Sequence, residues 1–496
     1  MYDLIIKNGW ILDGTGADGF TADIAITDGK IVAIGRDLGD GKKIIDATGL
    51  VVTPGLIDSH SHSDATMLAF PLQAEKAEQG ITTSISGCCG SSPFPSKECS
   101  AATFLNRVAD LPQGSHIATF VGHCALRQAV MGMENRPATA QELEQMKQLL
   151  REGIEAGALG ISFGLIYTPS CYAGTDELIA LAKVTKQCGG MISAHIRSEA
   201  DDVIEAVNEM ITVAKAANVR TVISHHKAMF RQNHGKIITT LEMIKAANRE
   251  GADIYCDVYP YVASSTTLAA RFIPNQYVND QLPQYLSDPE LRNRFKTMNV
   301  ELWGEDLSWV QLNTCCSYPQ YSGKLLTEIA PLHGKDIYET IFDIIQAEPN
   351  CSASFFSMCE EDVETVMAWE RTMICTDSEA AGDKKAYHPR LRGSFPRTLG
   401  RYVRERKVVS LPEMIRKMTT LPAAVYGLEN KGRIAVGYDA DICVMDPEKI
   451  IDRADFVDFT KRAEGLHYVF VMGQLVAENA VCNNSLPGKV LLIKHR

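Results

Sequence analysis

Long hydrophobic runs are absent from this chain of 496 residues. No stretch of about 18 apolar residues occurs, so no segment is expected to cross a membrane as a helix. The first residues also lack the basic and apolar regions of a secretory signal. We therefore expect no membrane partner and a cytoplasmic location.

Excess positive charge is also absent. The chain has 49 lysines and arginines against 61 aspartates and glutamates, which gives a net charge of -12 at pH 7. No basic face is expected to neutralise phosphate groups, so nucleic acid is not predicted as a partner. The composition is otherwise typical of a globular protein, with 45% hydrophobic residues. The length allows one large core and one or two smaller units.

The sequence contains 14 cysteines but no Cys-x-x-Cys pair. This absence argues against a zinc knuckle and against a thioredoxin-like redox couple. Most of the cysteines lie in apolar runs, where a reduced, buried thiol acts as a small packing residue. One of them, Cys89, is an exception because of the place where it lies.

Both ends of the chain have the pattern of β structure. Residues 1–50 consist of short apolar or alternating runs between glycine-rich turns, and residues 421–496 repeat that pattern. The two flanks enclose a middle of a different kind. We therefore predict a small β-sandwich that is built from both chain ends.

The middle of the chain, residues 51–420, alternates strand-like runs with amphipathic helices. Such alternation is typical of a parallel sheet, and the number of units favours a TIM-like (β/α)8 barrel over an open sheet. The rhythm breaks at about 280–350, which we predict to be an insertion near the last barrel strands, acting as a lid or pocket wall. Its Trp303 and Trp309 are expected to anchor the core of the insertion itself.

A strand-like run ends in two histidines within residues 51–64. The run is apolar, is broken by Pro54-Gly55, and ends in His60-Ser61-His62. Because side chains alternate along a strand, His60 and His62 point the same way and could reach one metal ion. Alone, the pair is weak evidence, because polar residues are common where strands end.

Four further ligand-type residues follow apolar runs downstream: Cys89, His195, His225 and Asp377. A barrel places its chemistry at the carboxyl ends of its strands, so these side chains are expected to meet His60 and His62 there. Thiolate and imidazole groups suit zinc. A metal ion makes its bound water acidic and polarises a carbonyl group, and a nearby carboxylate transfers the proton. The set predicts metal-assisted hydrolysis with Asp377 as ligand and general base.

The combination of motifs resembles the amidohydrolase superfamily, and within it the N-acyl-D-amino-acid deacylase (D-aminoacylase) family. The resemblance extends over nearly the whole chain. The motifs that carry it are Pro54–His62, Gly80–Gly90, Gly122–Arg127, Gly157–Tyr167, Ile223–Lys227, Asp257–Tyr261, His388–Arg397 and Pro487–Leu491.

The resemblance implies a zinc enzyme that hydrolyses N-acyl-D-amino acids to a carboxylate and a free D-amino acid. It implies one tightly held zinc ion on Cys89, His195 and His225. A second ion, weaker or absent, would use His60, His62 and Asp377, and Asp377 would be the general acid/base. The residues implied to bind the substrate carboxylate are Lys227, Tyr259, Ser265 and Arg390, with Tyr167 near the acyl carbonyl.

The sequence departs from the family pattern at three places. Phe163 stands where the family has a small polar residue, so the pocket near Tyr167 is expected to differ. Asp377 is followed by Ser-Glu in place of glycine, and the stretch that leads to Arg390 is longer. Cys88 offers a second thiol beside Cys89, although the register favours Cys89 as the ligand.

Three alternatives remain open to different degrees. A hydantoinase or dihydroorotase-like enzyme needs a metal-bridging lysine after the fourth barrel strand, and residues 160–167 contain none. An isoaspartyl-type dipeptidase, or a deacylase with another acyl preference, is not distinguished by these motifs. A catalytically inactive scaffold on the same fold is disfavoured because all six ligand-type residues are present. Oligomeric state and the preferred D-side chain are not determined.

Overall fold

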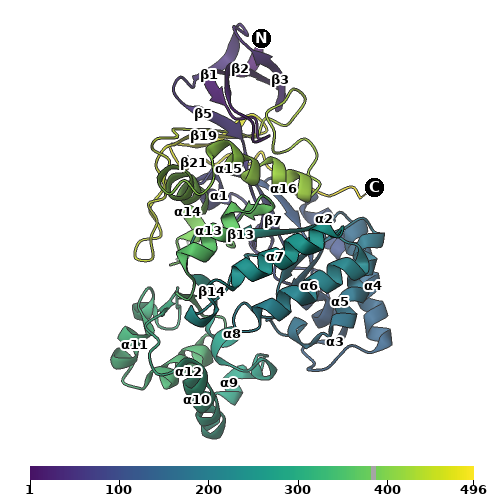
Figure 1. The fold of residues 1–496 in the computed structure, drawn as a ribbon, viewed down its shortest axis with the longest axis vertical. Coiled ribbons are helices and arrows are strands. Elements are labelled where there is room, and N and C mark those ends of the chain that lie inside the picture. The colour runs from purple at the N-terminus through teal and green to yellow at the C-terminus, as the bar shows by residue number, and fades with distance from the viewer. Residues whose placement is uncertain (381–386, 496) are drawn as a thin grey trace.

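The computed structural model describes residues 1–380 and 387–495. Its parts follow one another along the longest axis of the molecule (Figure 1). Strands from the chain ends lie at the top, parallel strands wrapped by helices occupy the centre, and a mostly helical unit lies at the bottom. None of the described helices is both long and apolar enough to cross a membrane.

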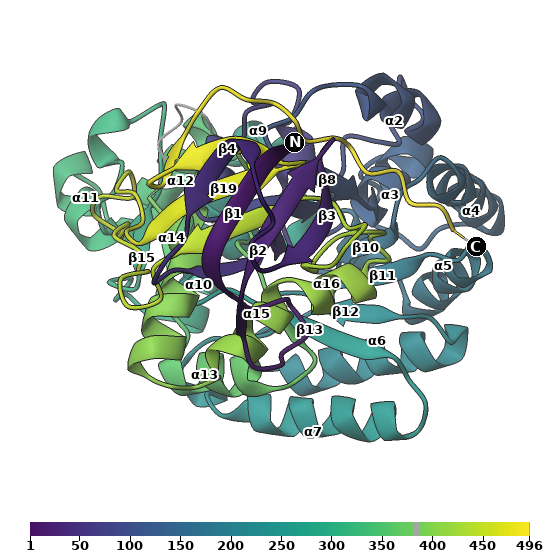
Figure 2. The ribbon, with the colours of Figure 1, turned by 90° about the horizontal axis from the view of Figure 1, so that it is seen from above.

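Strands from both chain ends pair in one nine-stranded sheet. The strand that joins the two ends is β5 (Val51–Pro54), which pairs parallel with β1 (Tyr2–Ile11) and antiparallel with β18 (Ile442–Met445). Figure 2 shows the purple N-terminal and yellow C-terminal strands together above the rest of the chain. The other strands are β2 (Phe20–Thr27), β3 (Lys30–Gly35), β4 (Gly41–Asp46), β19 (Leu466–Val471), β20 (Gln474–Glu478) and β21 (Val481–Cys482).

The centre of the molecule holds two sheets of parallel strands. One contains β6 (Leu56–Asp58), β7 (Ile81–Ser86) and β8 (His116–Thr119). The other contains β9 (Val121–Gly122), β10 (Gly160–Gly164), β11 (Met191–His195), β12 (Thr221–Ile223), β13 (Ile254–Val258) and β17 (Thr372–Ile374). Only Phe120 separates β8 from β9, and its amide donates to the carbonyl of Ser86. The first sheet therefore continues into the second.

The outer strands β6 and β17 also meet, at their carboxyl ends. The amide of Ser59 donates to the carbonyl of Ile374 at 3.3 Å, and the amide of Asp377 donates to the carbonyl of His60 at 2.9 Å. A parallel bridge joins Ser61 to Ser378. The strand-end residues predicted to carry the chemistry are thus gathered at one end of the parallel strands.

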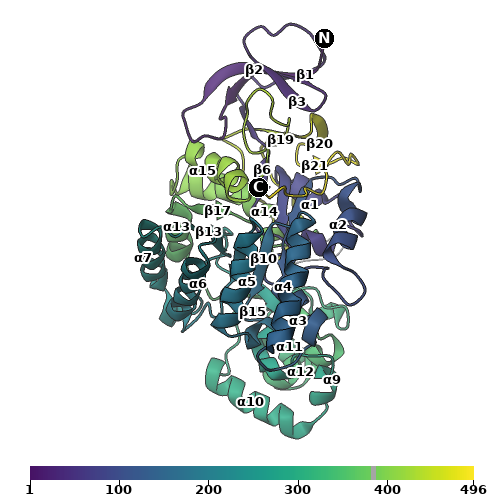
Figure 3. The same ribbon diagram turned by 90° about the vertical axis from the view of Figure 1, so that its right-hand side faces the viewer.

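Amphipathic helices cover the outside of the parallel strands (Figure 3). Helix α4 (Ala140–Glu155) begins with a capping box, in which Thr139 and Glu142 each accept from the other's amide. Its apolar face buries Met146, Leu150 and Ile154. The other helices here are α1 (Ala74–Ala77), α2 (Ala101–Ala109), α3 (His123–Met131), α5 (Thr175–Gln187), α6 (Val203–Ala217), α7 (Lys236–Arg249), α13 (Glu360–Ala368), α14 (Arg390–Arg397), α15 (Leu411–Met418) and α16 (Thr420–Val425).

A unit with its own core lies between β13 and α13. An antiparallel sheet of β14 (Ser264–Thr267), β16 (Ser352–Phe355) and β15 (Val310–Leu312) supports it. Its helices are α8 (Leu268–Phe272), α9 (Leu282–Tyr285), α10 (Pro289–Trp303), α11 (Leu326–His333) and α12 (Ile337–Ala347). The unit includes residues on both sides of the predicted segment 280–350. Trp303 and Trp309 pack against its core, as the sequence predicted.

A buried charge cluster fastens the terminal sheet to the parallel strands. Lys431 lies 2.6 Å from Asp441, which precedes β18, and 2.7 Å from Nε2 of His116 in β8. All three side chains are buried. Burial opposes ionisation of Asp441, but Lys431 and His116 outweigh it and hold the pKa of Asp441 well below its usual range. This carboxylate therefore stabilises the fold above the ordinary carboxyl pKa and loses that effect as the pH falls.

Replacing Lys431 by methionine should lower the free energy of unfolding by about 3–5 kcal/mol, because it leaves the buried carboxylate of Asp441 without its lysine. The matched control is Lys449→Met, since Lys449 is 74% exposed and pairs with Asp446 at 3.0 Å. That change should cost less than about 1 kcal/mol. Urea unfolding measures both, and equal losses would contradict the role of the cluster. The difference should shrink as the pH falls below the carboxyl range.

Candidate active site

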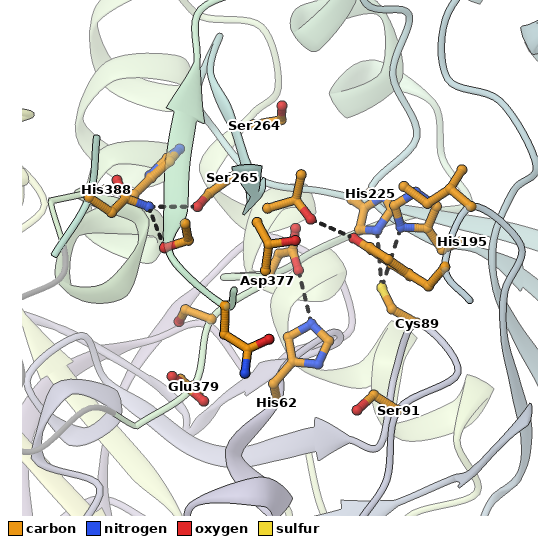
Figure 4. A pocket seen from close by; sticks show the side chains of 18 of the residues that line it. His62, Cys89, Ser91, His195, His225, Ser264, Ser265, Asp377, Glu379 and His388 are labelled. Carbon is orange, nitrogen blue, oxygen red and sulfur yellow. Dashed lines mark hydrogen bonds and ion pairs between the residues drawn. The ribbon is translucent and has the colours of Figure 1, made fainter. Parts of the chain in front are cut away.

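A cavity of about 850 Å³ opens where the parallel strands end. The strand ends contribute His62, Cys89, His195, His225 and Asp377, and Figure 4 shows their side chains turned toward one another. The β14–β16 sheet of the inserted unit forms the opposite wall. Such a concave site is large enough for a small molecule.

One group of predicted ligands meets around a thiol. The Sγ atom of Cys89, just after β7, lies 3.3 Å from Nε2 of His225 and 3.6 Å from Nδ1 of His195. All three residues are buried. Their ligand atoms lie within 4.8 Å of one another, which is close enough for one metal ion to touch all three.

A second group shares the same thiol. The Nε2 atom of His60 lies 3.3 Å from Sγ of Cys89 and 3.6 Å from Oδ1 of Asp377. The Nε2 atom of His62 lies 3.3 Å from the same Asp377 oxygen. Sulfur, imidazole nitrogen and carboxylate oxygen are all zinc ligands. The described residues therefore fit one ion or two, with Cys89 able to bridge them.

The choice between the two adjacent thiols is decided by the turn after β7. Cys88 packs into the apolar core and directs its thiol toward the carbonyl of Ile85. Cys89 lines the cavity. Its carbonyl oxygen packs against Gly164, where an added Cβ atom would lie only 2.0 Å from that oxygen. Cys89 is thus the thiol of the site.

Phe163, the unusual residue on β10, is buried against the ring of His123 and does not line the cavity.

Three of the ligand residues have a left-handed backbone. The φ angles are +52° at Cys89, +35° at His225 and +49° at Asp377. Non-glycine residues pay about 1–3 kcal/mol for such conformations, which persist where the surroundings enforce them. At His225 the amide donates to Oδ1 of Asp257 at 2.6 Å. This strain turns the side chains off their strands and into the cavity.

Mutual charge sets the protonation of the ligands. Burial raises the pKa of the Cys89 thiol, but His60 and His225 outweigh it and bring the pKa well below its usual value. Burial likewise opposes ionisation of Asp377, yet Arg390, then His225, hold its pKa well below its usual range. The centre therefore favours a thiolate and a carboxylate, the charge states that a cation requires.

The five residues implied to bind substrate all line the cavity. Arg390 donates to Oδ2 of Asp377 at 2.7 Å. The ring of Tyr259 lies between the two cations, with its centroid 5.5 Å from Nζ of Lys227 and 5.2 Å from Cζ of Arg390. Ser265 accepts from the amide of Asn313 at 3.0 Å, and the hydroxyl of Tyr167 lies 3.3 Å from that of Thr266. Residues 381–386, within the longer stretch before Arg390, lie outside the described residues.

Sequence reasoning missed Glu199, which ties three site residues together. Its Oε1 atom accepts from Lys227 at 2.5 Å and lies 2.9 Å from Nδ1 of His225, and its Oε2 atom lies 3.6 Å from Nε2 of His195. Glu199 is buried. Its one sequence signal was its place four residues after His195, in the loop that follows β11.

Arg271 of α8 was also missed. It lines the cavity, and its guanidinium lies over the rings of Phe230, Trp303 and Phe355. Among the described residues no carboxylate lies within 4.0 Å of it, and its Nε atom is buried without a partner. No sequence motif marks it, because an arginine in an amphipathic helix is usually a surface charge.

Comparison with known proteins identifies the family of this chain. Residues 43–257 and 373–477 match the amidohydrolase family. The chain is 34% identical to a D-aminoacylase of Alcaligenes xylosoxydans xylosoxydans, over 99% of this chain and 97% of that protein.

Two solved structures share the fold over the full length. One is an N-acyl-D-glutamate deacylase of Bordetella bronchiseptica complexed with zinc and a phosphonate mimic of the tetrahedral intermediate, with 32% identity, a TM-score of 0.87 and 99% coverage of both chains. The other comes from work on the binuclear metal centre of D-aminoacylase, in which one metal activates and the second attenuates. Its identity is 33% and its TM-score is 0.86, with coverage of 99% of this chain and 100% of that one. The predicted family is therefore confirmed: the chain is an amidohydrolase of the N-acyl-D-amino-acid deacylase (D-aminoacylase) family.

Proposed function

We propose that this protein is a zinc-dependent deacylase that cleaves the amide bond of N-acyl-D-amino acids, giving a carboxylate and a free D-amino acid. The observation that carries the proposal is the convergence of six ligand-type side chains, five of which, with Asp377 among them, line a small-molecule cavity. The D-aminoacylase and N-acyl-D-glutamate deacylase that resemble this chain over their full lengths support it.

Cys89, His195 and His225 would hold the first zinc ion, and His60, His62 and Asp377 would hold a second, weaker one. The unpaired Nδ1 of His60 and Nε2 of His195 are turned outward, toward Asp257 and Glu199, so the opposite nitrogens are free for metal. When bound, the ion supplies a positive charge that polarises the carbonyl and acidifies a water molecule.

The proton of the reaction is handled by Asp377. It accepts the proton from the attacking water and returns it to the leaving nitrogen. Arg390 contacts the other carboxylate oxygen and keeps Asp377 ionised before the reaction begins. Without that proton the amide nitrogen would have to leave as an anion, which is a very poor leaving group.

The substrate carboxylate is held by Lys227, Tyr259, Ser265 and Arg390, and Tyr167 lies against the acyl carbonyl. Lys227 also donates to Glu199, and Arg390 also donates to Asp377. These ion pairs fix the charged groups of both side chains before substrate binds, so less side-chain entropy is lost on binding. An arginine fork matches a carboxylate, and the lysine adds a point charge.

The substrate side chain is acidic, with Arg271 as its partner. A guanidinium that lines the cavity without a protein carboxylate is a site for an anionic group. The deacylase from Bordetella bronchiseptica acts on N-acyl-D-glutamate and supports the same chemistry.

The proposal also covers the architecture of the parallel strands and of the two chain ends. We infer that the parallel strands, with β8 and β9 counted as one, close into a (β/α)8 barrel. Within the predicted range 51–420 this barrel begins at β6, because β5 pairs in the terminal sheet. The hydrogen bonds between the ends of β6 and β17 support closure. Residues 1–50 and 421–496 form a small sandwich around a separate apolar cluster. Fourteen free cysteines support a reducing, cytoplasmic location.

The proposal is tested by offering N-acetyl-D- and N-acetyl-L-amino acids to the purified protein and measuring its zinc content. We expect hydrolysis of the D series only. Asp377→Asn should keep the zinc ion on Cys89 and lower turnover by about 100-fold or more. The control Asp362→Asn, a buried carboxylate that accepts from the amide of Gly235 away from the cavity, should keep its activity.

Other outcomes would reject parts of this proposal. Bound zinc without turnover on either enantiomer would point to a dipeptide or cyclic amide as substrate. Absence of both zinc and turnover would support a scaffold. Full activity in Asp377→Asn would show that another group moves the proton.

Removing the charge of Glu199 should weaken zinc binding. In Glu199→Gln the histidines lose the carboxylate that orients them, and zinc affinity should fall by about 10–100-fold. Competition with a chelator measures the dissociation constant. Glu209→Gln is the control, because Glu209 pairs with Arg197 and accepts from Thr175. Equal affinities in wild type and Glu199→Gln would show that the carboxylate has no such role.

Arg271→Met should lower kcat/KM for N-acetyl-D-glutamate by about 10–100-fold, the worth of a charged hydrogen bond. The rate for N-acetyl-D-leucine should stay the same or rise. The control Arg292→Met removes an arginine of the same inserted unit that also lies over a phenylalanine ring but pairs with Asp343. If Arg271→Met lowered kcat/KM equally for both substrates, the proposal of an acidic substrate side chain would be rejected.

A further inference from the structure

A second group of ligand-type side chains lies in the inserted unit, apart from the centre on the parallel strands. Cys315, Glu348 and Cys351 place two sulfur atoms and one carboxylate oxygen within 4.8 Å of one another. We propose that these three residues form a zinc site. Its two thiolates and one carboxylate make it selective for soft or borderline ions over calcium and magnesium.

The register of the small antiparallel sheet brings the two thiols together. Strand β15 pairs with β16 so that Leu312 faces Ala353, and the amide of Asn313 donates to the carbonyl of Ser352 at 2.9 Å. Cys351 directly precedes β16, and Cys315 lies three residues beyond the end of β15. Both side chains are 1% exposed. Two cysteines 36 positions apart thus face each other in a protected setting.

The carboxylate is held against the thiols by the backbone. Glu348 follows α12, and one of its oxygens accepts from the amide of Ser317 at 2.9 Å and from the thiol of Cys315 at 3.6 Å. The amide of Cys351 closes a turn onto the carbonyl of Glu348 at 2.9 Å. The ligand positions are therefore fixed by hydrogen bonds before any ion binds.

The carboxylate has no protein cation to balance it. Among the described residues, no lysine, arginine or histidine nitrogen lies within 4.0 Å of Glu348, whereas Glu199 has Lys227 at 2.5 Å. A partly buried anion without a counter-charge costs free energy. A divalent ion bound to the two sulfur atoms would supply that charge. The adjacent Cys316 is exposed and lies on the cavity wall, so a fourth position is open to it or to water.

The proposed site adjoins the substrate cavity without belonging to its chemistry. Glu348 and Cys316 form part of the cavity wall, together with Asn313, whose amide holds Ser265. A bound ion would tie the end of α12 to the start of β16. We assign it a structural role, to stiffen the wall that faces the substrate. The assignment does not depend on the deacylase proposal.

The test is the zinc content of the full chain after dialysis against dilute zinc with a weak chelator. Wild type should retain one zinc ion more than the double variant Cys315→Ser with Cys351→Ser. Cys188→Ser, which alters a free cysteine after α5, should match wild type. Glu348→Gln, which keeps both thiols, should bind the extra ion at least tenfold more weakly. Cadmium NMR of wild type should show a two-thiolate signal that the double variant loses.

Equal zinc content in wild type and the double variant would overturn the proposal. So would an ion that the weak chelator removes, which would be adventitious, or a Cys315–Cys351 disulfide that forms in air in the presence of zinc. Circular dichroism establishes that each variant is folded. Deacylase activity separates the two proposals, because the double variant should lose only the extra zinc and still turn over substrate. Absence of turnover in wild type would reject the deacylase alone.

Discussion

The rest of the structure depends on the hydrogen bonds that one buried carboxylate, that of Asp58, accepts. Its Oδ1 atom accepts from the amide of Thr376 at 2.8 Å, and its Oδ2 atom accepts from Nζ of Lys76 at 2.8 Å. These bonds hold the end of β6 against the end of β17. That contact brings His62 within 3.3 Å of Asp377, 315 positions away along the chain. The backbone bonds from Ser59 to Ile374 and from Asp377 to His60 join the same two strand ends.

In the candidate metal centre, the neighbouring residues hold the predicted ligands in unfavourable local geometry. Cys89, His225 and Asp377 all adopt left-handed backbone conformations. Such strain persists only where surrounding hydrogen bonds over-determine the conformation. Buried carboxylates do the same for the side chains, since Asp257 and Glu199 lie behind the histidines. The energetic cost is met by the large core of the parallel strands and their helices, and the result is a set of ligands placed before a metal arrives.

The predicted metal ligands come from one part of the chain, whereas the proposed substrate contacts are divided between that part and the inserted unit. The segments that match the amidohydrolase family, 43–257 and 373–477, carry all six predicted metal ligands. The segment between them carries Ser265 and Arg271, which line the cavity, and the proposed zinc site around Cys315. A scaffold that keeps its metal centre can therefore change its substrate through an inserted unit with a core of its own.

The sequence by itself determined the family, the strand-end positions of the six predicted ligands and the alternation of strands and helices, because these follow from local periodicity and short motifs. It also located a departure from that alternation at about 280–350. The register favoured Cys89 over Cys88, and the structure agrees. Only the tertiary structure decided that Glu199 holds Lys227, that Arg271 lies without a carboxylate partner among the described residues, and that Cys315 meets Cys351. Each of these depends on which distant segments pack together. Packing is set by the shape and burial of the whole chain, and no local pattern records it.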